Sequence, residues 1–233
     1  MSATENTIFH PAARPAKEQT SLLTRRLYDV AAPFYTVSAR LFHQQAHTAA
    51  LAGACVENGM RVLELATGSG EMFTRLLELN PDGHTVGVDL SPKMAAHTQG
   101  LARRMFPGSS ARCYAADARD LPFASGSFDV IMGCYLFELL PPGTIEDTLN
   151  ELRRVLVKGG RLTMILVSQT NPGFNAAYSL AGRLVPAFWG RQVDERLVRL
   201  LLPRHGFTLR RETYVTQIFY VSHVVSATAG ARA

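Results

Sequence analysis

The sequence predicts an α/β fold with a doubly wound, mostly parallel sheet. From Arg61 onward, short apolar runs alternate with helical patterns. The runs are rich in Val, Ile and Leu and do not alternate strictly with polar residues, as is typical of parallel strands covered on both faces. A length of 233 residues suits one such domain, because α/β folds of this size commonly remain undivided.

Seven strands are expected. Five are the apolar runs at residues 61–66, 84–89, 111–115, 128–134 and 161–168. Two further β-rich runs, 207–213 and 214–225, can pair antiparallel at one edge of the sheet. In this architecture ligands bind beyond the carboxyl ends of the strands, near the point where the strand order reverses. The loops after Ala66, Asp89, Ala115 and Cys134 are therefore the expected walls of a site.

Helices are expected between these strands. The first starts near Glu71 and ends before the Asn80-Pro-Asp-Gly83 turn. The second begins at Ser91-Pro92, where serine is a good N-cap and proline suits the first turn. A third is expected over 118–127 and a fourth over 144–157, where a basic last turn precedes glycines. A last helix spans 194–205.

The remaining segments predict additions to this domain. Residues 1–20 are expected to be a flexible N-terminus, residues 21–58 an N-terminal helical lid, and residues 59–233 the main domain. An aromatic-rich stretch at about 171–192 indicates an inserted helical cap. The N-terminus has no signal-peptide core, and no later run reaches the roughly 18 apolar residues of a membrane span. A cytoplasmic protein is the expectation.

Charge and cysteine content exclude several function classes. The formal charge of +5 comes mainly from scattered arginines, which suit solvated helix faces better than a nucleic-acid groove. The charge also permits peripheral contact with an anionic membrane. The three cysteines form no CxxC pair, so the sequence suggests neither a cysteine zinc site nor a disulfide framework. His43 and His47 have metal-ligand spacing but lack the glutamate of a zincin helix, so no metal is expected.

A glycine pair carries the strongest chemical signal. Gly68 and Gly70 lie directly after a predicted strand and before a helix, where a tight turn lets the backbone approach a ligand. A dinucleotide fingerprint requires a small residue three positions after Gly70, and Phe73 stands there. Glu71 puts a negative charge where a pyrophosphate would bind the helix N-terminus. Both residues count against NAD and favour a ligand without phosphates.

Asp89 ends the second predicted strand beside this loop. A carboxylate about 20 residues after the glycines suits the hydroxyls of a ribose. The alternative is that an Asp before Ser-Pro only caps a turn.

Four motifs together resemble, in order and spacing, those of class I S-adenosylmethionine-dependent methyltransferases. They are Glu64-Leu-Ala-Thr-Gly68-Ser-Gly70, Val86-Gly-Val-Asp89, Ala116-Asp117-Ala118 and Phe128-Asp129-Val-Ile. The segment Tyr28-Asp-Val-Ala-Ala-Pro-Phe-Tyr35 looks, more loosely, like the entry helix of the ubiquinone and menaquinone biosynthesis branch. The resemblance implies a Rossmann-like methyltransferase fold, with S-adenosylmethionine as cofactor and S-adenosylhomocysteine (SAH) as product.

The resemblance also implies roles for single residues. The methionine moiety would be lined by Glu64, Ala66, Thr67, Gly68 and Gly70. Asp89 would bind the ribose. The adenine would lie between Leu90 and Met94, and Asp117 would meet its amino group beside Ala118. Cys134 would face the sulfonium, and Tyr35 would close over the methionine carboxylate.

Ala66 departs from the glycine that the family often has at this position. Structural alternatives stay open for several other residues. Met94 also suits a helix core position, Asp117 a helix N-cap and Asp129 a structural role, while Tyr135 and Phe137 also suit sheet packing.

The leading functional hypothesis is a methyltransferase for a small, partly hydrophobic acceptor such as a quinone precursor, phenol or natural product. The aromatic cap favours an apolar pocket, and no Asn-Pro-Pro-Tyr follows Asp129, which disfavours nucleic acid. His43 is a candidate general base. The alternatives are a phospholipid N-methyltransferase, a non-catalytic cofactor-binding protein, and an NAD-dependent oxidoreductase.

Overall fold

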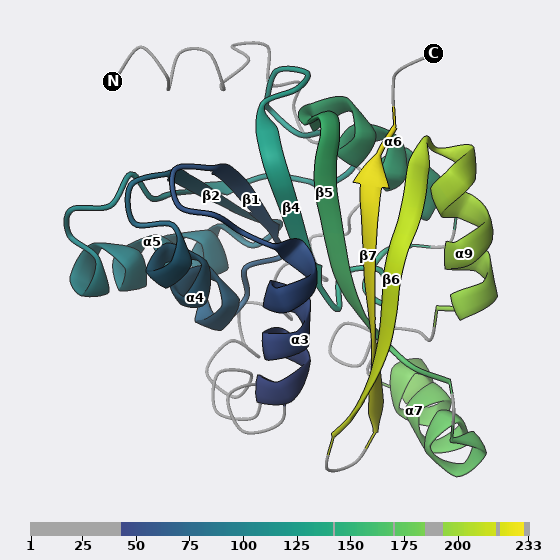
Figure 1. Cartoon of the computed structure of the whole chain (residues 1–233). Helices are drawn as coiled ribbons and strands as arrows, with labels where there is room; N and C mark the ends of the chain where they lie inside the picture. The colour runs from purple at the N-terminus through teal and green to yellow at the C-terminus, as the bar shows by residue number, and fades with distance from the viewer. Residues whose placement is uncertain (1–42, 142, 170, 185–192, 218–219, 231–233) are drawn as a thin grey trace.

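The computed structural model describes residues 43–230 apart from 142, 170, 185–192 and 218–219. Seven strands form one sheet in the order β3-β2-β1-β4-β5-β7-β6 (Figure 1). They are β1 (Arg61–Leu65), β2 (His84–Asp89), β3 (Arg112–Ala115), β4 (Phe128–Cys134), β5 (Leu156–Val167), β6 (Phe207–Thr216) and β7 (Val221–Ala229). The first five pair in parallel, and β7 is antiparallel to both β5 and β6. The predicted mostly parallel sheet is confirmed.

Helices cover both faces of the sheet (Figure 1). On one face α3 (Gln44–Ala54) and α4 (Glu71–Leu79) pack their buried side chains on β1, β4 and β5, and α5 (Pro92–Met105) packs beside α4. On the other face α6 (Ile145–Val155) and α9 (Glu195–Arg204) contribute to the largest core cluster. The helix α7 (Pro172–Leu184) follows β5 and lies near the turn end of the β6–β7 hairpin.

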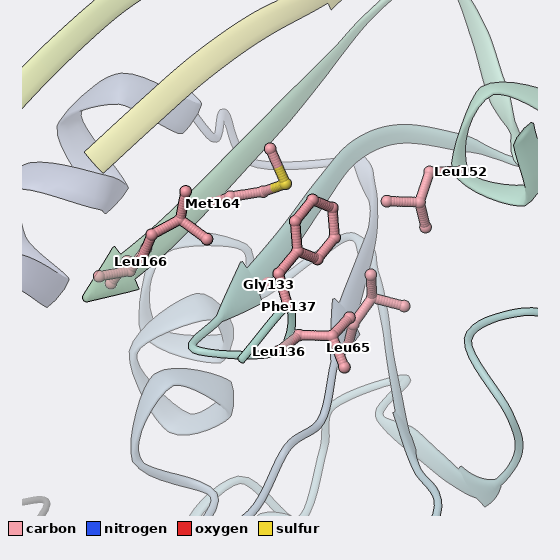
Figure 2. Close-up of a pocket in the computed structure, with 8 residues that line it drawn as sticks. Leu65, Gly133, Leu136, Phe137, Leu152, Met164 and Leu166 are labelled. Atoms are coloured by element: carbon pink, nitrogen blue, oxygen red, sulfur yellow. The ribbon is translucent and has the colours of Figure 1, made fainter. Parts of the chain in front are cut away.

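The core on the α6 face is apolar and closely packed. Figure 2 shows a small pocket there, in which the Phe137 ring lies among Leu65, Leu152 and Met164. Phe137 is only 1% exposed, and the pocket has no room for a water molecule. Phe137 is therefore a core residue, which confirms the alternative that it serves sheet packing. The pocket around it lacks the polar groups that a ligand site requires.

The prediction of a helix over residues 118–127 is wrong. Asp117 and Asp120 form an isolated bridge, and the chain then reaches β4 through a bend at Pro122 and a turn at residues 125–126. Side chains of α6 satisfy its backbone: Arg154 donates to the carbonyl oxygens of Leu121 and Phe123, and Glu151 accepts from the Leu121 N–H. These bonds replace the internal bonds of a helix and let Leu121 and Phe123 enter the core.

Two strand boundaries also differ from prediction. β5 begins at Leu156, before Lys158-Gly-Gly160, and Gly159 with φ +76° lies inside it. In the hairpin, β6 continues to Thr216, and the Gln217 N–H donates to the Tyr220 carbonyl just before β7. A division between residues 213 and 214 is therefore wrong, and the sequence between the two strands contains none of the Gly, Pro, Asn or Asp residues that usually mark a turn.

Other expectations lie partly outside the described residues. Of the N-terminal lid, His43 and α3 are described, followed by the connection to β1. Residues 1–20 and Tyr35 lie outside. Of the cap at 171–192, the helix α7 is described and residues 185–192 are not.

Candidate active site at the carboxyl edge of the sheet

The loop after β1 turns from strand to helix through left-handed backbone. Ala66, Gly68 and Gly70 have φ values of +54°, +49° and +77°. The Gly70 N–H donates to the Thr67 carbonyl at 2.8 Å, and Gly70 is the N-cap residue of α4. Glycine adopts this region freely, whereas a residue with a Cβ is strained by about 1 kcal/mol or more. Ala66 stands where the family often has glycine, so its left-handed backbone is strained. The loop still makes the turn from β1 to α4.

Asp89 holds this loop from the neighbouring strand. Its Oδ2 accepts from the Gly68 N–H at 2.9 Å and its Oδ1 from the Ser91 N–H at 2.9 Å. The predicted placement of the carboxylate beside the glycines is confirmed, and the turn-capping alternative is also realised through Ser91. Burial raises the pKa of Asp89, although both N–H groups act to lower it.

Phe73 and Gly87 explain why the loop differs from a dinucleotide site. Phe73 is fully buried on α4. A Cβ added to Gly87 on β2 would lie 3.0 Å from the Phe73 ring and 2.6 Å from Thr67 Cγ2. In a dinucleotide fingerprint the small residue lies on the helix. Here the small residue, Gly87, lies on β2, and the large residue, Phe73, lies on α4.

Buried acidic groups face this loop. Glu64 on β1 is 1% exposed, and its Oε2 has no hydrogen-bond partner among the described residues. The same holds for Oγ1 of Thr67 and Oε2 of Glu71. Burial, together with the nearby Asp89 carboxylate, raises the pKa of Glu64 well above its ordinary value. Such groups gain most from a ligand that brings hydrogen-bond donors or positive charge.

The ends of β2 and β3 carry the residues expected near an adenine. Leu90 is half-buried and Met94 is 7% exposed on α5. Asp117 follows β3, and its carboxylate pairs with the Arg119 guanidinium at 2.5 Å. The Asp117 carbonyl accepts from the Asp120 N–H in a turn, and no helix follows. The alternative that Asp117 is a helix N-cap is therefore wrong. Ala118 beside it packs on the core.

The end of β4 brings Cys134 and Tyr135 to the same edge. Burial and the Glu64 carboxylate raise the pKa of the Cys134 thiol well above its ordinary value, so the thiol is neutral. Tyr135 has φ +54°, the same left-handed value as Ala66 after β1. Since β1 and β4 are neighbours where the strand order reverses, two strained non-glycine residues flank the switch point, where binding sites concentrate.

Asp129 lies at the opposite end of β4 from this edge. It pairs with Arg61, whose Nη2 lies 2.6 Å from Oδ1, and it also accepts from the Arg61 backbone N–H. The alternative that Asp129 has a structural role is confirmed.

His43 precedes α3 and lies over the end of β4. Its ring centroid is 4.7 Å from that of Tyr135 and 5.9 Å from that of His47. Its Nδ1 is 2.7 Å from the Tyr220 hydroxyl oxygen. Burial, followed by the charge of His47, lowers the pKa of His43 to about 4. That value is below the near-neutral range best suited to a general base.

The lowered pKa of His43 predicts acid sensitivity. The folded protein holds fewer protons than the unfolded chain between pH 6.5 and about 4, so stability is complete above pH 6.5 and is lost as the pH falls through this window. At pH 5 this difference in proton binding has lowered the free energy of unfolding by about 1 to 2 kcal/mol. Urea unfolding should show a smaller loss between pH 7 and pH 5 for His43→Phe than for the wild type. Equal losses in the two proteins would contradict the prediction.

Sequence reasoning missed Tyr220 and Ser222. Tyr220 is 177 residues from His43 in the chain, and no spacing rule connects them. Their meeting depends on the antiparallel placement of β7 beside β5, which brings the start of β7 to the carboxyl edge.

Across the described ranges, no three His, Cys, Asp or Glu side chains gather as metal ligands would. None of the described helices combines the length and the apolar character that crossing a bilayer demands.

Comparisons with known sequences point to one family. A model described as a methyltransferase domain matches residues 62–160. The chain is similar to a demethylmenaquinone methyltransferase of Thermus thermophilus, with 39% identity over 45% of this chain and 46% of the relative. It is also similar to a ubiquinone/menaquinone biosynthesis C-methyltransferase of Dinoroseobacter shibae, with 36% identity over 52% and 48%. The matches thus span about half the length of these curated relatives.

Solved structures support the fold. A putative methyltransferase in complex with the Haloferax volcanii Trm112 methyltransferase activator aligns with a TM-score of 0.76 and 18% identity, over 90% of this chain and 99% of that one. The magnesium protoporphyrin IX methyltransferase of Synechocystis with bound SAH aligns with a TM-score of 0.62 and 17% identity, over 92% and 90%. At such identities the likeness concerns the fold.

Proposed function

The chain carries a methyltransferase domain of the class I, S-adenosylmethionine-dependent type at residues 62–160, and from this premise we propose that it methylates a small, partly hydrophobic acceptor. One observation carries the proposal. The glycine loop, the Asp89 carboxylate that holds it and the unpartnered Glu64 carboxylate meet at the switch point of the sheet.

The residues present fit the cofactor. Asp89 lies where it can accept hydrogen bonds from ribose hydroxyls, and its backbone contacts keep the carboxylate in place. Glu64 Oε2 and Thr67 Oγ1, buried and without partners among the described residues, suit the ammonium-bearing methionine part. Glu71 at the start of α4 suits a cationic ligand better than a pyrophosphate. Asp117 would have to share its carboxylate between Arg119 and the adenine amino group.

The chemistry follows from charge and position. When bound, S-adenosylmethionine supplies an electrophilic methyl group on a sulfonium. The Glu71 carboxylate gives this end of the sheet negative potential, because its contacts with His47 and Arg75 outweigh the effect of burial and lower its pKa. The neutral thiol of Cys134 adds no competing nucleophile. What the chain itself must do is hold the acceptor in line with the methyl group and keep water away.

The acceptor is proposed to be an aromatic hydroxyl compound of the quinol or phenol class. Support comes from aromatic residues that share one packed cluster with Cys134, namely Tyr135, Phe174, Tyr178 and Tyr220, and from His43, whose ring packs on this cluster. Of the two named relatives, one is a demethylmenaquinone methyltransferase and the other a ubiquinone/menaquinone biosynthesis C-methyltransferase. Each relative is matched over only half its length, so the acceptor class needs its own test.

Calorimetry with three ligands tests the cofactor assignment. We expect the wild-type chain to bind SAH and S-adenosylmethionine with micromolar or tighter affinity, because the site offers buried acceptors for both ends of these molecules. NAD should not bind measurably, since Glu71 opposes its phosphates. Binding of NAD with no response to SAH would overturn the proposal. A methyl-transfer screen over quinols, phenols, amines and lipids, read by product mass, would then identify the acceptor.

A further inference from the structure

Four polar side chains form a connected cluster beside the proposed methyl-transfer site. We call His43, Tyr135, Tyr220 and Ser222 the tyrosine–histidine cluster. The Tyr220 hydroxyl lies 2.7 Å from His43 Nδ1 and 3.4 Å from the Tyr135 hydroxyl. The Tyr135 hydroxyl in turn lies 2.8 Å from Ser222 Oγ. The cluster joins three separate parts of the chain.

This cluster is adjacent to the cofactor loop. Tyr135 directly follows Cys134 at the end of β4, and its left-handed backbone marks the switch point. On the other side, His43 stacks near His47, whose Nδ1 is 3.6 Å from Glu71 Oε1 in the first turn of α4. A molecule held at the cluster would therefore lie next to the loop that receives the cofactor.

Aromatic rings pack around the Tyr220 ring. Phe174 of α7 stacks on Tyr220 with ring centroids 5.6 Å apart and planes 16° apart. Tyr178 lies beside Phe174, and the His43 ring lies 4.7 Å from Tyr135. Rings in such arrangements favour another flat ring as neighbour. The surroundings suit a planar aromatic ligand that brings one or two polar groups.

The Tyr220 hydroxyl has a short contact to His43 and also interacts with Tyr135 and Ser222, and its contact with Tyr135 is weak enough for a ligand hydroxyl to replace. A phenol hydroxyl offers one donor and two acceptor sites, and the contact to Tyr135 at 3.4 Å is long for an O–H···O bond. Burial raises the pKa of Tyr220 to about 12, so the hydroxyl keeps its proton. His43 is neutral at pH 7 because its pKa is lowered to about 4. Two neutral groups at 2.7 Å fix the direction of the hydroxyl without introducing charge.

We propose that Tyr220 positions the methyl acceptor, its hydroxyl binding a hydroxyl group of a planar aromatic substrate, and that His43 acts through Tyr220 by orienting that hydroxyl. The inference rests on the proposed function, because it places the acceptor beside a bound cofactor. It makes Tyr220 a determinant of acceptor affinity and His43 a positioning residue. It also gives His43 a role other than proton removal.

Equilibrium binding to the full chain saturated with SAH tests the inference. The probe is 1,4-naphthohydroquinone, kept reduced under anaerobic conditions and titrated by calorimetry. We expect Tyr220→Phe to weaken probe binding about five- to tenfold, which is the loss of one neutral hydrogen bond, and to leave SAH affinity unchanged. Tyr214→Phe is the matched control, since its hydroxyl bonds Glu195, away from the cluster, and it should leave both affinities unchanged.

A double-mutant cycle tests the link between the two residues. His43→Phe keeps a ring against Tyr135 and removes the nitrogen that faces Tyr220. We expect it to weaken probe binding several-fold in the wild-type background and less than twofold in the Tyr220→Phe background, because a residue acting through Tyr220 has no effect without its hydroxyl. Fully additive losses would overturn the positioning role of His43.

The outcomes separate this inference from the proposed function. Absence of SAH binding by the wild-type chain would overturn the proposed function and the inference with it. Normal SAH binding with no probe binding would overturn the aromatic acceptor class. Normal SAH and probe binding, with Tyr220→Phe equal to the wild type, would overturn the role of Tyr220 alone.

Discussion

Replacing Asp89 with alanine is expected to raise the dissociation constant of SAH at least about a hundredfold. A carboxylate that accepts from two ribose hydroxyls contributes about 1.5 to 3 kcal/mol per bond, and each 1.4 kcal/mol is about a factor of ten in affinity. The variant also removes the acceptors for the N–H groups of Gly68 and Ser91. The loop then loses its contact with β2 at the point where it must hold the ligand. Calorimetry gives the dissociation constant directly.

Two controls distinguish the ribose contact from a disturbed loop. Asp82→Ala removes an exposed carboxylate that bonds Asn58 beyond the other end of β2 and should leave SAH affinity unchanged. The wild type should also prefer SAH over its 2′-deoxy analogue, and Asp89→Ala should abolish that preference. A preference of equal size in both proteins would show that Asp89 acts only on the backbone of the loop.

The sheet and the cofactor edge were predictable because local signals specify them. Apolar runs without alternation indicate covered parallel strands, and Gly68, Gly70 and Asp89 follow strands directly, so their meeting at one edge follows from the architecture. The spacing even predicts the neighbourhood of Asp89 and the glycine loop, which the hydrogen bond to Gly68 confirms.

The features that were missed depend on contacts distant in sequence. The segment 118–127 carries a weak helical pattern, but Arg154 and Glu151 on α6 bind its backbone in a non-helical form. Likewise the contact between His43 and Tyr220 requires α3, β4 and β7 to be placed first. Local propensity contains no information about either partner, and tertiary contacts override it.

Gly87→Ala is expected to lower the free energy of unfolding by about 2 to 3 kcal/mol. The added methyl carbon would lie 2.6 Å from Thr67 Cγ2, 3.0 Å from the Phe73 ring and 3.1 Å from Cys113 Sγ. Two of these neighbours are constrained: Thr67 is 4% exposed and β-branched, and Phe73 is fully buried. Overpacking a close-packed interior costs about 1 to 3 kcal/mol. Urea unfolding measures the loss, and Gly108→Ala, where a Cβ meets nothing within 4 Å, is the matched control.

The same substitution connects packing to the cofactor loop, because the nearest obstacle, Thr67, belongs to that loop. If Thr67 moves to accept the methyl group, SAH affinity should fall together with stability. Adding Thr67→Ser to Gly87→Ala removes the Cγ2 atom and should restore part of both. Recovery of stability without recovery of SAH affinity would mean that the Thr67 methyl group itself contributes to the cofactor site. If Gly87→Ala is no less stable than Gly108→Ala, Gly87 is not the residue that makes room for Phe73, and the exclusion of a dinucleotide site must rest on Glu71 alone.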